Sequence, residues 1–218
     1  MIKLEHTEVF GFVGAIRGAR NPMNSWAKSD SKWDGSKFIM GENDLGLCKR
    51  LCKAGSDHRK FMRQIFVSVD ITAPLYWWKE FDTYKVGTVA NSCSTMHKIH
   101  AKEFTLDDFS CEHLWGDSHE RDVDEPIGVM NIVIDTLNYY REVFLETKEK
   151  SHWWQMIQLL PSSYNQKRTC TFNYEVLMNM YHARKNHKLD EWHDFCHWVE
   201  KLPYSDLITS VTVSQLSQ

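Results

Sequence analysis

The sequence predicts an α+β fold in a single domain spanning residues 1–218. Apolar side chains alternate with period 2 over residues 64–71, which predicts a half-buried strand. Apolar residues at helical spacing predict one long amphipathic helix (Met130, Val133, Ile134, Leu137, Tyr140 and Phe144), and further helices are expected over residues 172–185 and 189–201. No internal repeat or low-complexity linker interrupts the chain. Strands early and helices late therefore favour one antiparallel or mixed sheet with packed helices.

The remaining elements are predicted from local signals. Residues 21–41 are polar and contain Ser, Lys and Trp, which is typical of irregular structure. Asn43 or Asp44 is expected to cap a helix that runs to about Ala54. Pro74 stands where another helix begins, with apolar residues at helical spacing after it (Leu75, Trp78 and Phe81).

Composition narrows the function classes. With 218 residues, 42% of them hydrophobic and 25% charged, the chain is an ordinary globular sequence that can bury a sizeable core. A formal net charge of −3 argues against bulk electrostatic binding of nucleic acid, although a local basic pocket remains compatible with it. No apolar run approaches the roughly 20 residues that span a membrane. The start of the chain lacks the apolar core of a secretory signal, so a cytoplasmic protein is expected.

The cysteines and histidines favour a protein without a metal. The six cysteines form no CxxC pair and are interpreted as thiols in a reducing compartment. The only ligand-like group lies in the segment EWHDFCHWVE and comprises Glu191, His193, Cys196 and His197. His193 and His197 share a helix face, which is compatible with a metal, but no HExxH pattern accompanies them. A solvated helix face is the preferred interpretation.

A small polar cluster follows the aromatic run after Pro74. It is rich in hydroxyl groups and flanked by cations, which suits an anion such as a phosphate (Asn91, Ser92, Cys93, Ser94 and Thr95, then His97 and Lys98). The alternative is structural, because Asn91 and Ser94 are both good caps for a helix that starts near Thr95.

A second pattern lies near the C-terminal end. Leu160-Pro161 is followed, twelve residues after the proline, by the segment NYEVLMNMYHAR, which carries Asn173, Leu177, Asn179 and Arg184. This spacing resembles the Leu-Pro pair and the NxRxLxxFLxLR helix of the flavin-dependent thymidylate synthases. The segment from Tyr84 to Met96 resembles the RHRxxSxNExSxRY signature of the same family, with most of its arginines replaced.

Further segments extend the resemblance thinly over nearly the whole chain. AIRGARNPM resembles the family's opening helix-and-arginine segment, and CKAGSDHRKF resembles its HGHExxxF loop with one residue inserted. His187 and Glu191 keep the separation of the family's His and Glu landmark, one residue early.

The resemblance implies a homotetramer with active sites between subunits. Such enzymes bind FAD and dUMP, and they move a one-carbon unit from methylenetetrahydrofolate to the pyrimidine while NADPH reduces the flavin. Carried over by position, Arg184 would contact the nucleotide base and polarise its carbonyl. The phosphate would be held by Ser94 and its neighbours (Ser92, Thr95 and Lys98). The cofactor contacts would come from a third set of residues (His58, Lys85, Asn91, Asn173 and Asn179).

The departures from the family pattern affect charged contacts. Tyr84-Lys85-Val86 stands where the family has Arg-His-Arg, and Glu175 stands where its helix has an arginine. Other positions differ as well (Val89, Ser92, Met96 and Ile157). Each lost charge-assisted contact costs on the order of 1.5–3 kcal/mol, so ordinary FAD binding is in doubt. Cations at neighbouring positions are candidates to compensate (Lys85, Lys98, Lys167 and Arg168).

Three function classes remain at this stage. The first is a thymidylate synthase-like transferase acting on a pyrimidine deoxynucleotide. The second is a nucleotide-binding, sequestering or regulatory protein without catalysis, and the third is a structural oligomer without a ligand. Taken alone, Arg184 is also explained as a last-turn cation facing the helix dipole. The tryptophan pairs at 77–78 and 153–154 are expected in the core or at a subunit interface.

Overall fold

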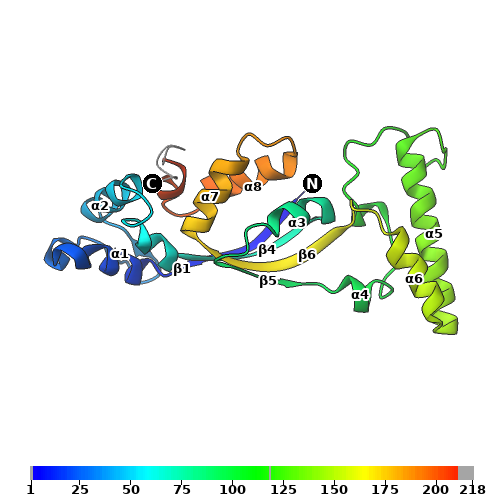
Figure 1. Cartoon of the computed structure of the whole chain (residues 1–218), viewed down its shortest axis with the longest axis horizontal. Helices are drawn as coiled ribbons and strands as arrows, with labels where there is room; N and C mark the ends of the chain where they lie inside the picture. Colours follow the sequence, from blue (N-terminus) through cyan, green and yellow to red (C-terminus); the bar gives the residue numbers. More distant parts are fainter. Residues whose placement is uncertain (1, 118, 211–218) are drawn as a thin grey trace. The chain divides into compact units, whose positions relative to one another are not determined.

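A computed structural model describes residues 2–117 and 119–210 and confirms the α+β fold (Figure 1). Four strands form an antiparallel sheet in the order β1 (Lys3–Phe10), β4 (Phe66–Pro74), β6 (Asn165–Asn173) and β5 (Thr88–Ser92). A hairpin pairs β2 (Lys32–Trp33) with β3 (Phe38–Ile39). The α-helices are α1 (Phe12–Arg20), α2 (Glu42–Lys53), α3 (Leu75–Phe81), α4 (Thr95–Lys98), α5 (Pro126–Thr147), α6 (Lys150–Leu159), α7 (Tyr174–Arg184), α8 (Asp190–Glu200) and α9 (Asp206–Thr209).

The chain divides into two compact units. Unit 1 comprises Ile71–Thr83 and Asn91–Arg168 together with the start of β1. Unit 2 comprises Leu4–Asp70, Tyr84–Ala90 and, among the described residues, 169–210. The boundaries fall inside each of the four strands of the sheet and, outside the strands, between Thr83 and Tyr84. The single domain over 1–218 stays a prediction.

The strand predicted over residues 64–71 is confirmed as β4. Its inward side chains Val67, Val69 and Ile71 are buried, while the residues between them are half-buried, as the period-2 pattern requires. The expected order of strands before helices is wrong, because β5 follows α3 and β6 lies between α6 and α7. β6 reads NQKRTCTFN and buries only its last residues fully, which hides the alternation.

Unit 1 has its core between α5 and α6, which lie side by side in Figure 1. Leu137 of α5 and Met156 of α6 are fully buried there, and they pack with aromatic residues of the 99–109 segment. The long helix predicted from its apolar spacing is therefore confirmed as α5, and its apolar face is covered by α6. Trp77 and Trp78 are buried in unit 1, as expected for core residues.

Unit 2 joins α1 and α2 through a buried ion pair. Arg20 at the end of α1 donates from Nε to Asp44 Oδ1 over 2.5 Å, and both side chains are at most 5% exposed. Ser29 and Ser31 donate to the other carboxylate oxygen at 2.7 and 2.6 Å. The helix predicted up to Ala54 is confirmed, but its cap is wrong. Gly41 is the N-cap, because Asp44 turns inward to Arg20 and Asp30 accepts from the backbone N–H groups of residues 43 and 44.

The segment 21–41 is more ordered than the sequence predicts. It contains two single 3-10 turns, Asn21–Met23 and Trp26–Lys28, followed by the β2–β3 hairpin. Asp44 holds it in place, since the backbone N–H groups of Asp30 and Ser31 also donate to its carboxylate. A buried carboxylate thus helps to order a segment that is polar along much of its length.

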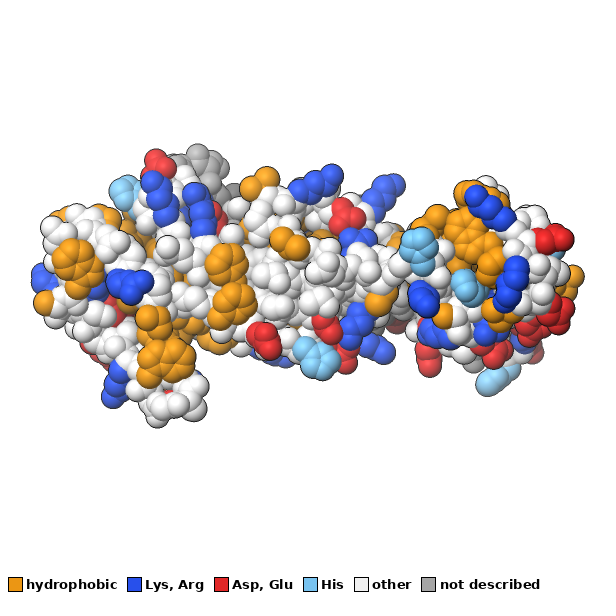
Figure 2. Space-filling model, turned by 90° about the horizontal axis from the view of Figure 1, so that it is seen from below, with side chains coloured by type: hydrophobic (Ala, Val, Ile, Leu, Met, Phe, Trp, Pro, Cys, Tyr) orange, Lys and Arg blue, Asp and Glu red, His pale blue; other side chains and the backbone are white. Residues whose placement is uncertain are grey.

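Large apolar side chains remain exposed on both units. On the face shown in Figure 2 they appear as separate orange groups among charged side chains. They include Phe10, Val13, Trp26 and Trp33 in unit 2, and Tyr139, Trp154 and Leu159 in unit 1. Across residues 2–117 and 119–210, no helix combines the length and the apolar character needed to cross a membrane.

Candidate functional site

Helix α7 carries three residues of the candidate site. Asn173 is its N-cap, and its Oδ1 accepts from the backbone N–H of Val176 at 3.0 Å. The helix buries Tyr174, Leu177, Met178 and Met180, whereas Asn179 is exposed. Asn173 therefore has a structural role that the sequence pattern did not reveal. Asn179 is exposed, so its side chain is accessible to a ligand.

Arg184 is the last residue of α7 and is half-buried. Its Nε donates to the hydroxyl of Tyr84 at 2.9 Å, across 100 residues of sequence. Its guanidinium carbon lies 4.9 Å from the centre of the Trp192 ring and 5.6 Å from that of the Tyr84 ring. Both distances are within the range of cation–π attraction. The side chain is thus held by two aromatic rings and one hydrogen bond rather than extended into solvent.

The turn from Tyr84 to Gly87 approaches the same helix at its other end. Gly87 has a left-handed φ of +77°, and a Cβ there would come within 3.1 Å of Asn173 Nδ2 and of a Val176 methyl carbon. Only glycine fits this approach without displacement. The turn that replaces the family's Arg-His-Arg therefore contacts α7 near Asn173 and again at Arg184. Sequence reasoning missed Tyr84, because only the folded chain brings it to the arginine.

The polar cluster at residues 91–98 forms a separate set in unit 1. Ser94 is the N-cap of α4, and its Oγ accepts from the backbone N–H of His97 at 3.1 Å, which confirms the capping interpretation for this residue. Asn91 caps no helix and lies in β5. The cluster members Ser92, Ser94 and Lys98 are exposed, and Thr95 is half-buried. The hydroxyl of Ser94 accepts a bond but keeps its own proton for donation.

The candidate residues divide between the two units. The phosphate candidates Ser92, Ser94, Thr95 and Lys98 lie in unit 1. Arg184, Asn173, Asn179, His58 and Lys85 lie in unit 2. A site that combines the two groups stays a prediction.

Glu175 reverses the charge of the family position and has two arginine partners. Its Oε1 accepts from Arg59 Nε at 3.3 Å, and Arg63 forms a two-pronged ion pair with the same carboxylate. Arg59 is 3% exposed and Arg63 is 50% exposed. Two guanidinium groups therefore share one carboxylate. His58, in the turn just before Arg59, is exposed.

The compensating cations named from the sequence are placed differently. Arg168 donates to Asp82 Oδ1 at 2.7 Å, and its guanidinium carbon lies 4.1 Å from the Trp78 ring centre. Lys85 is exposed in the turn of unit 2. Of the four candidates, Arg168 is thus held in an ion pair with Asp82, which argues against its replacing a lost cofactor contact.

The segment EWHDFCHWVE lies within α8 (Asp190–Glu200). Burial raises the pKa of Cys196 to about 12, so the free thiol stays protonated at neutral pH. His193 faces Asp190 at 3.7 Å. In the described residues, no three His, Cys, Asp or Glu side chains are arranged to hold a metal ion.

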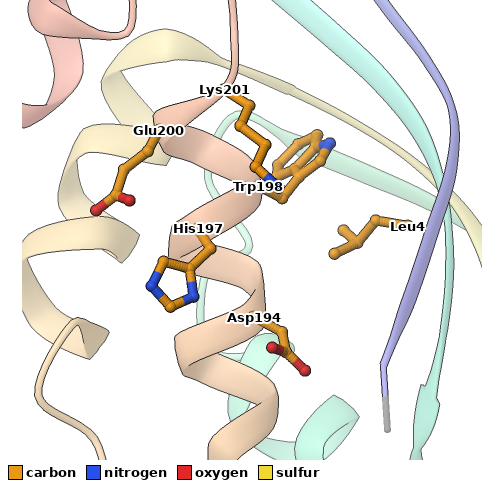
Figure 3. Close-up of a pocket in the computed structure, with 6 residues that line it drawn as sticks. All are labelled: Leu4, Asp194, His197, Trp198, Glu200 and Lys201. Carbon is orange, nitrogen blue, oxygen red and sulfur yellow. The ribbon is translucent and has the colours of Figure 1, made fainter.

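One side of α8 borders an open cleft of about 500 Å³ against β1 (Figure 3). It is lined by Leu4, Asp194, His197, Trp198, Glu200 and Lys201. Trp198 donates from its indole nitrogen to Thr7 at 3.0 Å, and Glu200 accepts from Tyr181 at 2.8 Å. These contacts fix α8 to its neighbours, and none of the residues predicted to bind the nucleotide or the cofactor lines the cleft.

The cysteines are all reduced in the structure. Burial raises the pKa values of Cys48 and Cys52 to about 12. Cys93, next to Ser94 in the sequence, is exposed.

Comparisons with known proteins support the fold at low identity. No protein-family model matches the sequence, and no curated protein matches it significantly. Two crystal structures of the flavin-dependent thymidylate synthase ThyX from Helicobacter pylori with FAD and dUMP match at 16% identity. The first has a TM-score of 0.69 and covers 96% of this chain and 98% of its own; the second has 0.67 and covers 99% of both. The UMP/dUMP methylase PolB from Streptomyces cacaoi, bound with 5-Br dUMP, matches at 14% identity with a TM-score of 0.60. It covers 100% of this chain and 97% of its own. This chain therefore has the fold of the flavin-dependent thymidylate synthases along nearly its whole length.

Proposed function

We propose that this protein binds a pyrimidine deoxynucleotide of the dUMP class through Arg184 and transfers a one-carbon unit to its base. The observation that carries the proposal is the fixed guanidinium of Arg184 at the end of α7, between Tyr84 and Trp192. The same helix keeps Asn173 and Asn179 in the register of the family. Support also comes from the similar folds of a synthase bound to dUMP and a UMP/dUMP methylase.

Arg184 suits a base carbonyl better than a lysine would. A guanidinium presents a rigid, planar set of donors, and it stays charged at any ordinary pH. A uracil ring carbon attacks an electrophilic one-carbon unit from an electron-rich, enolate-like form of the ring, and formation of that form places negative charge on the ring carbonyl oxygen. A fixed donor near that oxygen stabilises the developing charge without having to reorganise.

The phosphate is assigned to the unit 1 cluster in this proposal. The hydroxyl of Ser94 retains a proton to donate, and Ser92 and Lys98 are exposed beside it. Thr95 contributes its backbone and hydroxyl. Hydroxyl groups with one neighbouring cation are sufficient partners for phosphate oxygens.

FAD does not fit the residues in the manner of the family. Glu175 stands in place of an arginine, and Arg59, Arg63 and Arg168 are already paired with carboxylates. The remaining candidates for a cofactor contact are mostly neutral (His58, Lys85, Asn91, Asn173 and Asn179). No chemical step is therefore assigned to a flavin. Methylenetetrahydrofolate and NADPH rest on the resemblance alone.

The second candidate function is nucleotide binding without turnover. Glu175 favours it, because a carboxylate with two arginine partners turns a cofactor position into a structural ion cluster. In this case Arg184 would still bind the base, and the protein would sequester or sense the nucleotide.

Calorimetric titration of dUMP tests the binding part. Wild type is expected to bind, and Arg184→Ala to bind at least about tenfold more weakly, since a hydrogen bond to a charged group is worth roughly 1.5–3 kcal/mol. Arg121→Ala is the matched control, because Arg121 is exposed and its ion pair with Asp135 lies at the surface. Equal affinities of wild type and Arg184→Ala contradict the assignment, and absence of binding by wild type leaves a structural oligomer.

Turnover separates the two candidates. The protein is incubated with dUMP, methylenetetrahydrofolate and NADPH, with and without FAD, and the mass of the nucleotide is measured by mass spectrometry. A product heavier by one methylene group supports the transferase, whereas unchanged dUMP supports the binding protein. Light scattering checks the homotetramer that belongs to the same proposal.

A further inference from the structure

We propose that Tyr84 is a positioning residue: its hydroxyl fixes the orientation of the Arg184 guanidinium and thereby sets the affinity for the nucleotide base. The inference deepens the proposed function and rests on it for the role of Arg184. Tyr84 stands where the family signature has an arginine, so its role here is a property of this chain and not one carried over by resemblance.

The hydrogen bond controls the plane of the guanidinium. Nε is the atom of the guanidinium nearest the side-chain stem, and it lies in the plane of the group. A bond of 2.9 Å from Nε to the Tyr84 hydroxyl therefore limits rotation of the whole plane. The ring of Trp192, 4.9 Å away, restricts movement out of that plane.

Both holding groups are themselves fixed. Trp192 is fully buried in α8 and packs edge-on against Phe195 at 5.5 Å between ring centres. Tyr84 belongs to a turn in which the backbone N–H of Thr88 donates to Lys85 O at 3.4 Å. The same turn is seated against α7 through Gly87 beside Asn173. The hydroxyl of Tyr84 is thus supported from the opposite end of the helix that carries Arg184.

The chemistry of tyrosine suits this place. A cation at position 84, as in the family pattern, would lie against the guanidinium of Arg184 and repel it. A phenol hydroxyl accepts from Nε without adding charge, and its ring adds a cation–π contact at 5.6 Å. The change from arginine to tyrosine therefore converts a cofactor contact into a support for the base-binding arginine.

The experiment compares Tyr84→Phe with Tyr181→Phe in the full chain. The first variant keeps the ring and removes the acceptor for Arg184. The second removes a phenol hydroxyl of α7 that is bonded at 2.8 Å to Glu200 and has no part in the candidate site. Two readouts are used: dUMP affinity by calorimetry, and solvent exchange of the Arg184 Nε–H by NMR, with the resonance identified by its loss in Arg184→Lys.

Tyr84→Phe is expected to bind dUMP roughly tenfold more weakly than wild type and to exchange the Nε–H faster, with the melting temperature nearly unchanged. Tyr181→Phe should change neither readout. In an Arg184→Lys background, Tyr84→Phe should cause no further loss of affinity, because no Nε–H remains to be held.

Unchanged exchange and affinity in Tyr84→Phe would overturn the inference, as would an additive loss in the Arg184→Lys background. If wild type binds no dUMP, the proposed function fails and the affinity part of this inference fails with it. The exchange measurement then still shows, independently of any ligand, whether Tyr84 orders the guanidinium.

Discussion

Glu175 on α7 neutralises the buried guanidinium of Arg59, which approaches its Oε1 to 3.3 Å from the segment before β4. The two residues are 116 positions apart, and Arg63 pairs with the same carboxylate from the solvent side. A buried charge is costly unless it is paired, so Arg59 and Glu175 depend on each other. The reversed charge at position 175 is therefore part of the stability of unit 2.

Replacing Glu175 should destabilise the fold. Glu175→Gln keeps the shape and removes the charge that balances Arg59, and we expect a loss of about 3 kcal/mol in the free energy of unfolding. The control Arg63→Gln removes a partner that is 50% exposed and should cost less than about 1 kcal/mol. Urea unfolding of the two variants measures the difference. Equal losses would show that the burial of Arg59 does not govern this cluster.

Placing an arginine at position 175, as in the family that the sequence resembles, should also fail. Glu175→Arg would set three guanidinium groups against one another, and we expect a larger loss of stability than in Glu175→Gln together with no gain in FAD binding. Flavin fluorescence of the purified variant and its melting temperature check both parts. A stable, flavin-binding Glu175→Arg protein would contradict the structural role of this cluster.

The stability of the protein should fall as the pH drops below about 6.5 because of His182. Its Nε2 lies 3.0 Å from Ile208 O, and in the described part of the chain its buried Nδ1 has no hydrogen-bond partner. Burial lowers the pKa of His182 below its usual value, and the charge of the nearby Lys185 lowers it further. The bond to Ile208 raises the pKa but does not offset these two effects. The unfolded chain then takes up the proton first, so folding weakens as the solution is acidified.

Melting temperatures of wild type and His182→Gln between pH 5 and 8 check this behaviour. The advantage of wild type over the variant should shrink as the pH falls, because glutamine takes up no proton. A constant difference across the range would mean that His182 does not contribute to the pH dependence.

Asp44 makes the stability of the protein depend on pH in a second, more acidic range. Burial by itself raises the pKa of Asp44, but hydrogen bonds from Ser31, Ser29 and Arg20 more than offset it, so the pKa is lowered overall. Its contribution is thus present above the ordinary carboxyl pKa of 3.8 and is lost as the pH falls below it. Asp44→Asn should cost about 3–4 kcal/mol at pH 7, since it leaves Arg20 buried without its charge partner.

The matched control for Asp44 is Asp135→Asn. Asp135 also pairs with an arginine, but its side chain is 49% exposed, and a surface pair contributes at most about 1 kcal/mol. Similar losses for the two variants, measured by urea unfolding at pH 7, would argue against a special role for the buried pair.

Much of the fold was predictable because burial leaves a periodic trace in the sequence. β4 alternates cleanly, and α5 shows its apolar face at helical spacing, so both were expected at nearly the observed bounds. β6 was not, because its first half is polar. Those side chains are satisfied by distant partners: Asn165 by Ser110, Gln166 by the Cys93 carbonyl, and Arg168 by Asp82. Such partners exist only in the folded chain.

The candidate site divides in the same way. The cap at Ser94 was predictable, because capping depends on residues three positions apart. The bond between Tyr84 and Arg184 was not, since it spans 100 residues and a tyrosine has no motif of its own in that place. The arginine partners of Glu175 were hidden for the same reason, and the sequence showed only the lost arginine.

The core of unit 1 should respond to a single truncation. Leu137 is fully buried between α5 and α6, where Met156 is also fully buried, and Leu137→Ala is expected to cost about 2–5 kcal/mol through lost contacts and a cavity. Tyr139→Ala, two residues along the same helix at a position that is 60% exposed, should cost much less. Thermal unfolding followed by circular dichroism distinguishes them, and comparable losses would contradict the assignment of this core.

The role of Ser94 can be separated into capping and phosphate binding. Asn and Asp are as good as Ser at an N-cap, so Ser94→Asn and Ser94→Asp should both leave the melting temperature unchanged. Only Asp adds a negative charge. If Ser94 and Lys98 hold the nucleotide phosphate, Ser94→Asp should weaken dUMP binding by at least about fivefold through repulsion between like charges. Binding of deoxyuridine, which has no phosphate, should be unaffected.

Ser94→Asn and Lys98→Ala complete the test of the phosphate assignment. Ser94→Asn keeps the cap without a charge and should bind dUMP far better than Ser94→Asp does. Lys98→Ala should lower the preference for dUMP over deoxyuridine, because it removes a cation that attracts the phosphate and that deoxyuridine does not use. Calorimetry with both ligands gives the ratio for each variant. If Ser94→Asp weakens the binding of dUMP and of deoxyuridine equally, or changes neither affinity, then Ser94 acts only as the cap of α4 and the phosphate lies elsewhere.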